Sequence, residues 1–200
     1  ERDVSLNTGT MVSKALRSKG HNVIMLDVFM GYHEEEEDIT DIFNHTEEAS
    51  ADVAQIPGEA PDIAQVKAMR KDQSACFFGP NVIKICQAAD IVFMALHGEN
   101  GENGKIQAAF DLFGIQYTGS RYLGSALAMD KGISKKMFEA AGIPTPHGIA
   151  MSKTQRHTPF SETGLTLPCV VKPCCGGSSI GVTIVRTADE YEAALDEAFK

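Results

Sequence analysis

The sequence predicts an α/β protein in which a parallel sheet is covered by helices. Two observations predict it: short continuous apolar runs alternate with segments of helical periodicity, and glycines or prolines separate them. Apolar runs without polar alternation are typical of strands buried on both faces. A hydrophobic content of 43% and a charged content of 22% are those of a globular chain, and 200 residues can form one large domain or two small ones.

The first element expected is a helix that ends at Gly20, after a basic last turn. Four apolar positions at helical spacing predict it: Met11, Val12, Ala15 and Leu16. A buried strand is expected over residues 23–26. Residues 31–75 are polar and acidic and contain two prolines, so we interpret them as a variable loop or excursion.

The next stretch repeats the alternation of helix and strand. A helix is expected over residues 82–89 and a buried strand over 91–96, which ends at His97. A second helix is closed by Gly114. Its apolar stripe consists of Ile106, Ala109, Phe110 and Phe113. A short strand over residues 115–117 follows.

The last third of the chain begins with a helix that starts at Asp130 and ends at Gly142. Its apolar positions are Ile133, Met137 and Ala141. Two prolines make residues 143–146 a rigid connector, and a strand is expected near residues 147–150. A final helix is predicted by the capping-box pair Thr187 and Glu190 and by an apolar face. That face consists of Tyr191, Ala194, Leu195 and Ala198.

Residues 170–181 carry the strongest functional signal. A β-branched run ends in Lys172, Pro173 breaks the strand, and glycines and serines form a loop before a second apolar strand over residues 182–185. Such glycines let successive N–H groups point one way and form an anion site, to which a lysine adds charge. The alternative is an ordinary hairpin with a polar turn. A P-loop is excluded because the lysine precedes the glycines.

Composition excludes several classes of function. A net charge of −9 argues against a nucleic-acid partner. We interpret the acidic run at residues 34–38 as a solvated loop rather than a metal site. Five cysteines without paired C-x-x-C spacing favour a reducing cytoplasm over a disulfide framework or a zinc site. The apolar run at residues 91–96 is too short to span a membrane. We expect further sequence before Glu1 and after Lys200.

Taken together, several motifs make the chain similar to a known family. The first segment, Glu1–Gly9, resembles the pattern E-R-x-V-S-L-x-[ST]-G. The other pieces, in the same order as in the family, are Leu96–Gly98, Gly101–Gly104, Tyr117–Ser120, Ser125–Lys131, Gly142–Pro146, Val171–Pro173 and Gly177–Gly181. On these segments the chain resembles the D-alanine–D-alanine ligases of the ATP-grasp superfamily. Only residues 31–75 match poorly.

The resemblance implies a Rossmann-like N-terminal domain with a parallel sheet at residues 1–127, followed by the first part of an ATP-grasp α+β domain at 128–200. It implies a cytoplasmic enzyme of peptidoglycan precursor synthesis that joins two D-alanines through a D-alanyl phosphate. It also implies ATP and Mg²⁺ as cofactors, a homodimer, and metal ligands beyond residue 200. We therefore expect no metal ligand in this chain, and no turnover by these 200 residues alone.

The resemblance also assigns the first substrate to particular residues. Glu1 is expected to hold the ammonium of the first D-alanine through a charge-assisted hydrogen bond. His97 is expected to orient the substrate carboxylate. Ser178 is expected to bind the substrate and to close the loop for catalysis, so Glu1 and Ser178 are the expected catalytic residues. The alternatives without a role in substrate binding are a frayed terminal glutamate for Glu1 and an ordinary loop histidine for His97.

ATP is assigned to the lysines and the loop. Lys131 and Lys172 are expected to meet the phosphates, and Gly177, Ser178 and Ser179 to close over them. The helix dipole disfavours a cation in the first turn, where Lys131 stands, and a bound phosphate would offset this. A solvated surface lysine is the alternative.

The loop departs from the family pattern at Cys174, Cys175 and Gly176, which is tolerable because the backbone does the binding. Nothing in the sequence supplies a base that would make Cys175 a nucleophile. Three other functions stay open. They are a D-alanine–D-lactate or D-alanine–D-serine ligase, another ATP-grasp carboxylate–amine ligase, and a non-catalytic nucleotide-binding module.

Overall fold

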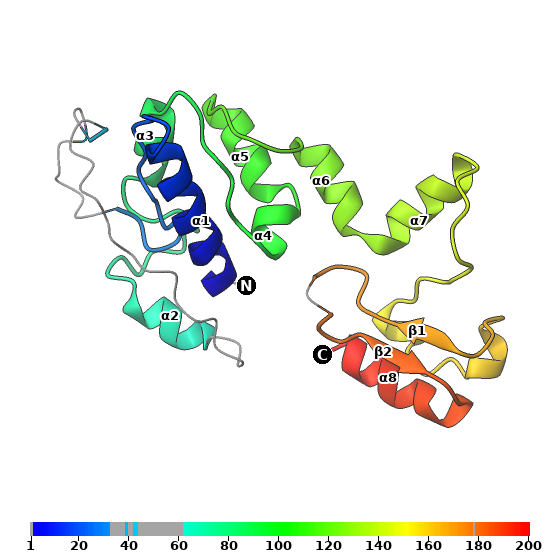
Figure 1. Ribbon diagram of the computed structural model, residues 1–200. Helices are drawn as coiled ribbons and strands as arrows, with labels where there is room; N and C mark the ends of the chain where they lie inside the picture. The colour runs from blue at the N-terminus through cyan, green and yellow to red at the C-terminus, as the bar shows by residue number, and fades with distance from the viewer. Residues whose placement is uncertain (1, 33–38, 40–41, 44–61, 178) are drawn as a thin grey trace. The chain divides into compact units, whose positions relative to one another are not determined.

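The computed structural model describes residues 2–32, 39, 42–43, 62–177 and 179–200. They belong to two compact units (Figure 1). The first unit comprises residues 1–101 and 105–121, and the second comprises 102–104 and 122–200. No helix in the described part of the chain is both long and apolar enough to cross a membrane.

The described helices of the first unit confirm three predictions and correct one. They are α1 (Arg2–Arg17), α2 (Ile63–Met69), α3 (Val82–Ala88), α4 (Glu99–Glu102, which runs into the second unit) and α5 (Lys105–Phe113). The helices expected before Gly20, over 82–89 and before Gly114 are present. The interpretation of residues 31–75 as a loop is wrong where α2 stands. Asp62 caps that helix by accepting from the backbone N–H groups of Ala64 and Gln65.

The core of the first unit lies between α3 and α5. Its buried residues are Val82, Cys86, Ile106, Phe110 and Ile115. Helix α1 does not follow the predicted apolar stripe, because Met11 is 54% exposed whereas Thr10 and Ser13 are buried. The two hydroxyls donate to carbonyls four residues earlier in their own helix. A helix face whose hydroxyls are satisfied in this way can be buried although it is polar.

The predicted parallel sheet is present only in part. Val92 and Tyr117 form a parallel bridge, with hydrogen bonds from Val92 N to Gln116 O and from Thr118 N to Val92 O. The remaining residues of 91–96 and 115–117 form no ladder in the described part of the chain. Residues 23–26 form none either, so the strands expected there are not confirmed. The guanidinium of Arg17 donates to Val23 O at 2.6 Å, which occupies a carbonyl that a neighbouring strand would use.

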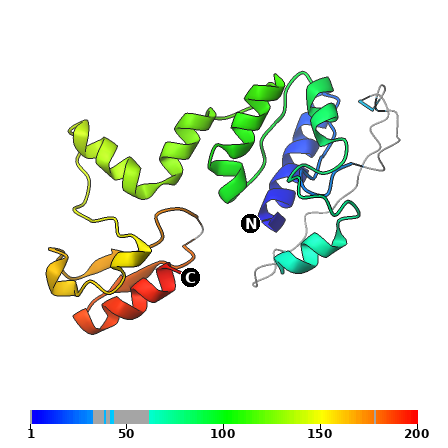
Figure 2. The ribbon, with the colours of Figure 1, turned by 180° about the vertical axis from the view of Figure 1, so that it is seen from behind.

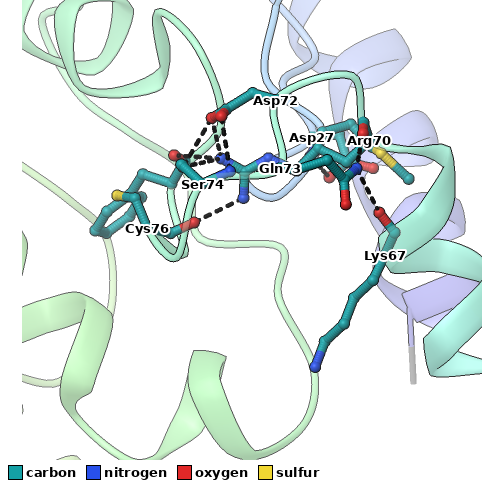
Figure 3. Close-up of polar contacts among 9 residues, drawn as sticks. Asp27, Lys67, Arg70, Asp72, Gln73, Ser74 and Cys76 are labelled. Atoms are coloured by element: carbon teal, nitrogen blue, oxygen red, sulfur yellow. Dashed lines mark hydrogen bonds and ion pairs between the residues drawn. The ribbon is translucent and has the colours of Figure 1, made fainter.

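A buried arginine in the first unit holds residues 72–78. Arg70 is 3% exposed, and its guanidinium donates to Cys76 O and Phe78 O at 2.7 and 3.2 Å (Figure 3). It also pairs with the Asp72 carboxylate at 2.7 Å and stacks 4.9 Å above the ring centre of Phe29. A planar guanidinium can serve several acceptors at once because its donors lie in a fixed fork.

The second unit combines helices with an antiparallel hairpin. Its helices are α6 (Tyr122–Met129), α7 (Lys131–Ala140) and α8 (Tyr191–Ala198), with 3₁₀ turns η1 (Lys153–Gln155), η2 (Phe160–Glu162) and η3 (Ala188–Glu190). The strands are β1 (Cys169–Val171) and β2 (Thr183–Val185). Cys169 pairs with Val185, and Val171 pairs with Thr183, which confirms the predicted strand–loop–strand.

Helix α8 lies along this hairpin in both views (Figures 1 and 2). Its predicted face buries Tyr191, Ala194 and Leu195 against Val185. The capping box of Thr187 and Glu190 is present at η3. The strand expected near residues 147–150 is wrong, because that segment has no ladder partner among the described residues. One of the nearby carbonyls, Pro146 O, accepts from the Lys135 side chain instead.

Candidate functional site

The predicted site residues fall into one group in each unit. His97 belongs to the first unit, whereas Lys131, Lys172, Gly177 and Ser179 belong to the second. Glu1 and Ser178, the two expected catalytic residues, lie outside the described residues, so their roles stay predictions.

His97 follows the extended segment 91–96 and is held by α1. Its backbone N–H donates to Ser5 Oγ at 2.9 Å, and its Nε2 lies 3.0 Å from Thr8 Oγ1. The ring is otherwise exposed. The end of a buried segment therefore presents an imidazole whose main chain and ring are both fixed by hydroxyls of one helix.

The glycine loop, residues 174–181, follows β1, and three of its described residues have left-handed backbone. Gly176 and Gly181 have φ of +99° and +69°, and Ser179 has φ of +59° although it carries a side chain. A left-handed non-glycine residue costs of order 1–3 kcal/mol and occurs preferentially at ligand sites. A Cβ on Gly181 would lie 3.0 Å from Pro173 Cγ, so a side chain there would crowd the proline as well as strain the backbone. Gly177 and Ser179 are exposed, as a ligand-binding loop requires.

Lys131 ties the glycine loop to helix α7. Its backbone N–H donates to Cys174 O at 2.9 Å, and its ammonium donates to Cys174 O and Gly176 O at 3.3 and 2.8 Å. Asp130 caps the helix as predicted, accepting from Gly132 N and Ile133 N. A lysine in the first turn of a helix faces an unfavourable dipole. In this structure the loop carbonyls and the neighbouring Asp130 carboxylate offset that cost.

The charges at this loop suit an anion. Lys172 is exposed and Lys131 is half-buried. In the described part of the chain, neither forms an ion pair with a carboxylate. Phosphate oxygens are stronger acceptors for an ammonium than neutral carbonyls are. The arrangement can therefore accept phosphate groups by exchange of the carbonyls bound to Lys131.

The described residues offer no group of three His, Cys, Asp or Glu side chains that could hold a metal ion. The residues present therefore do not fit a magnesium site by themselves, and we assign them no metal-dependent step.

Sequence reasoning gave no role to three residues that shape these sites. Ser5 and Thr8 belong to the first motif, and their spacing of three residues places the two hydroxyls on the same face of a helix. Arg70 lies in the stretch interpreted as a loop. An arginine in a polar segment gives little sequence signal for burial, because two of its acceptors are main-chain carbonyls, which every residue carries.

Comparison with family descriptions gives two matches. Residues 1–120 match the family described as "D-ala D-ala ligase N-terminus", and residues 137–200 match "D-ala D-ala ligase C-terminus". The D-alanine--D-alanine ligase of Lacticaseibacillus casei is 39% identical over 203 residues, covering 100% of this chain and 55% of that protein. The one from Pediococcus pentosaceus is 41% identical, covering 100% and 56%. The chain thus spans about half the length of these curated relatives.

Comparison with solved structures also finds ligases of this kind. The D-alanine--D-Alanine ligase of Bacillus anthracis complexed with ATP is 37% identical with a TM-score of 0.53, covering 60% of this chain and 40% of that chain. The VanG D-Ala:D-Ser ligase of Enterococcus faecalis is 40% identical with a TM-score of 0.52, covering 56% and 33%.

Proposed function

The chain belongs to the D-alanine–D-alanine ligase family, and on that premise we propose that the full-length protein joins two D-alanines at the expense of ATP. One carboxylate takes the γ-phosphoryl group and becomes an acyl phosphate. The amine of the second D-alanine attacks that carbonyl, and phosphate leaves. The product serves peptidoglycan precursor synthesis. The observation that carries the proposal is a glycine loop held by Lys131 in a chain that resembles these ligases over its whole length.

The glycine loop and its lysines bind the phosphates of ATP. Phosphoryl transfer depends chiefly on positioning and on charge neutralisation. Lys131 exchanges its carbonyl partners for phosphate oxygens, and Lys172 supplies a second charge at the end of β1. Gly177, Ser178 and Ser179 close over the phosphates. The ATP complex of the Bacillus anthracis relative supports ATP as the nucleotide.

Three residues bind the first D-alanine. Glu1 holds its ammonium, His97 orients its carboxylate, and Ser178 ties the closed loop to the substrate. Of these three residues, the structure describes His97, and its fixed ring supports an orienting role.

The domain organisation that we propose follows from the family matches. Residues 1–127 form a Rossmann-like N-terminal domain and residues 128–200 the first part of an ATP-grasp domain, for which the matches to 1–120 and 137–200 are the support. Magnesium is held by residues beyond residue 200 and would neutralise phosphate charge when bound. All five cysteines are free thiols, which supports a cytoplasmic location.

A D-alanine–D-serine ligase is the second candidate. VanG matches this chain with 40% identity, the same value as another Bacillus anthracis D-alanine--D-Alanine ligase structure.

Product analysis tests the proposal. The full-length gene product is incubated with Mg-ATP and D-alanine, alone or with D-serine or D-lactate, and products are identified by mass spectrometry alongside phosphate release. We expect D-alanyl-D-alanine as the main product and its loss in Lys172→Ala. A mixed D-Ala–D-Ser or D-Ala–D-Lac product would change the second substrate. ATP binding without any product would favour a non-catalytic nucleotide-binding module. Light scattering on the same sample tests the proposed homodimer.

A further inference from the structure

Helix α1 holds His97 at two points. Ser5 Oγ accepts the backbone N–H of His97 at 2.9 Å, and Thr8 Oγ1 lies 3.0 Å from the ring nitrogen Nε2. Ser5 and Thr8 are three residues apart, which places both on one face of the helix. The main chain of His97 is thus fixed by the first hydroxyl, so that only side-chain rotation remains for the second to fix.

Two other hydroxyls of α1 show the ordinary alternative. Thr10 Oγ1 donates to Leu6 O at 2.9 Å, and Ser13 Oγ donates to Gly9 O at 2.6 Å. Hydroxyls inside helices commonly bond a carbonyl one turn earlier in this way. Ser5 and Thr8 meet a residue that is 92 and 89 positions away in the sequence. Their contacts are therefore tertiary and converge on one residue.

We infer that Thr8 is a positioning residue that makes Nδ1 of His97 the nitrogen that faces substrate. A hydroxyl can donate or accept. With Thr8 as the acceptor of Nε2–H, the single proton of the neutral imidazole lies on Nε2. Nδ1 then holds the lone pair, and it takes up the proton when the ring becomes charged. The imidazolium donates from Nδ1 to an anionic oxygen while Nε2–H stays bound to Thr8. This inference rests on the proposed function, in which His97 meets the first D-alanine.

Because the His97 ring is exposed, the Thr8 hydroxyl contributes to ordering it. An exposed side chain samples several rotamers, and ordering it during each turnover costs entropy. A single neutral hydrogen bond contributes about 0.5–1.5 kcal/mol, which corresponds to roughly two- to tenfold in rate. Loss of the Thr8 hydroxyl should lower kcat/KM for D-alanine by about that factor and leave ATP binding unchanged.

The experiment uses the full-length gene product with Thr8→Val, which keeps the shape but removes the hydroxyl, and Thr8→Ser, which keeps the hydroxyl. Thr10→Val is the matched control, since it removes a hydroxyl of the same helix that does not touch His97. Kinetics for D-alanine are measured at saturating ATP, also in the His97→Gln background. Selective ¹⁵N-histidine NMR, assigned with His97→Gln, reports the ring protonation directly.

We expect the wild-type ring to be protonated at Nε2, and Thr8→Val to mix the tautomers while Thr8→Ser and Thr10→Val do not. Thr8→Val should lower kcat/KM, with no further loss in the His97→Gln background. An equal loss in that background, or a wild-type ring protonated at Nδ1, overturns the inference. Should the protein show no ligase activity, the proposed function fails, whereas the NMR result still decides the role of Thr8.

Discussion

Two cations in this molecule hold loops by donating to main-chain carbonyls, and they differ in every other respect. Arg70 in the first unit is 3% exposed, pairs with Asp72 and serves Cys76 O and Phe78 O. Lys131 in the second unit is half-buried and binds only carbonyls of the glycine loop among the described residues.

The difference separates a structural cation from one that can bind a ligand. A buried charge must be paired and hydrogen-bonded permanently, because its removal leaves the partners desolvated. A cation at the surface that rests on neutral carbonyls loses little when it changes partners. We therefore expect substitution of Arg70 to affect folding, and substitution of Lys131 to affect binding.

The largest effect is expected for Arg70→Met. Without the guanidinium, Cys76 O and Phe78 O lose their donor, and the first unit should lose about 3–5 kcal/mol of unfolding free energy. Urea unfolding followed by circular dichroism measures this. Arg70→Lys should restore only part of the loss, because an ammonium cannot serve the same fork of acceptors. Wild-type stability in Arg70→Met would show that the arginine is dispensable.

Lys131→Met is expected to affect ATP binding rather than folding. It should weaken ATP binding to the full-length protein by about 2–4 kcal/mol, as for truncation of one member of a desolvated charge pair. The unfolding free energy should change by less than about 1 kcal/mol, because Lys131 is only half-buried and has no carboxylate partner among the described residues. Isothermal titration with ATP and a urea titration give the two values. A large loss of stability with unchanged ATP affinity would make Lys131 a second structural cation.

Two glycines, one near the segment held by Arg70 and one in the glycine loop, test the same difference between the two regions. A Cβ on Gly79, next to the arginine-held segment, would lie 2.4 Å from Gly31 N, whereas one on Gly176 would meet nothing within 4 Å. Gly79→Ala should cost about 1–3 kcal/mol through overpacking. Gly176→Ala should cost about 1–2 kcal/mol, because only its φ of +99° is unfavourable. Gly124→Ala in α6 is the control, since neither problem arises there. Thermal unfolding of the three variants ranks them, and equal losses would contradict the contrast.

The smallest effect is expected from pH. Hydrogen bonds from Ser74 and the nearby Arg70 guanidinium lower the pKa of Asp72 from its ordinary value of 3.8. Because the folded pKa is the lower one, the ionised carboxylate contributes its full stabilisation above pH 3.8. That stabilisation is lost as the pH falls through the folded value. Urea midpoints between pH 5 and pH 3 should fall more steeply for wild type than for Asp72→Asn, and parallel slopes would argue against this role.

Local signals in the sequence predicted α1, α3, α5, α7 and α8 but not α2, α4 or α6, and they predicted the sheet poorly. Gly20, Gly114 and Gly142 end helices as predicted, each with positive φ, and Thr187 with Glu190 forms the predicted capping box. These devices depend on neighbours within a few residues. Strands depend on distant partners, so residues 23–26 and 147–150 could be extended and apolar without any ladder in the described structure. The burial of Arg70 was not predicted for a different reason: two of its acceptors are main-chain carbonyls, which leave no mark on the sequence.

The candidate site shows the same limit. Lys131 and the glycine loop were predicted together from motifs, and the structure connects them through Cys174 O and Gly176 O. The motif that contains Ser5 and Thr8 was recognised as well. That these hydroxyls meet His97 depends on how α1 packs, which no local pattern encodes.

The buried Cys86 makes the core of the first unit chemically observable. Its side chain lies between α3 and α5, and burial raises the pKa of its thiol to about 11. Only the thiolate reacts with alkylating reagents, so at neutral pH Cys86 should be labelled only when the core opens. Cys76 in the same unit is exposed and reacts without any opening. The ratio of the labelling rates of Cys86 and Cys76 therefore measures how often the core of the first unit opens, without any contribution from the second unit.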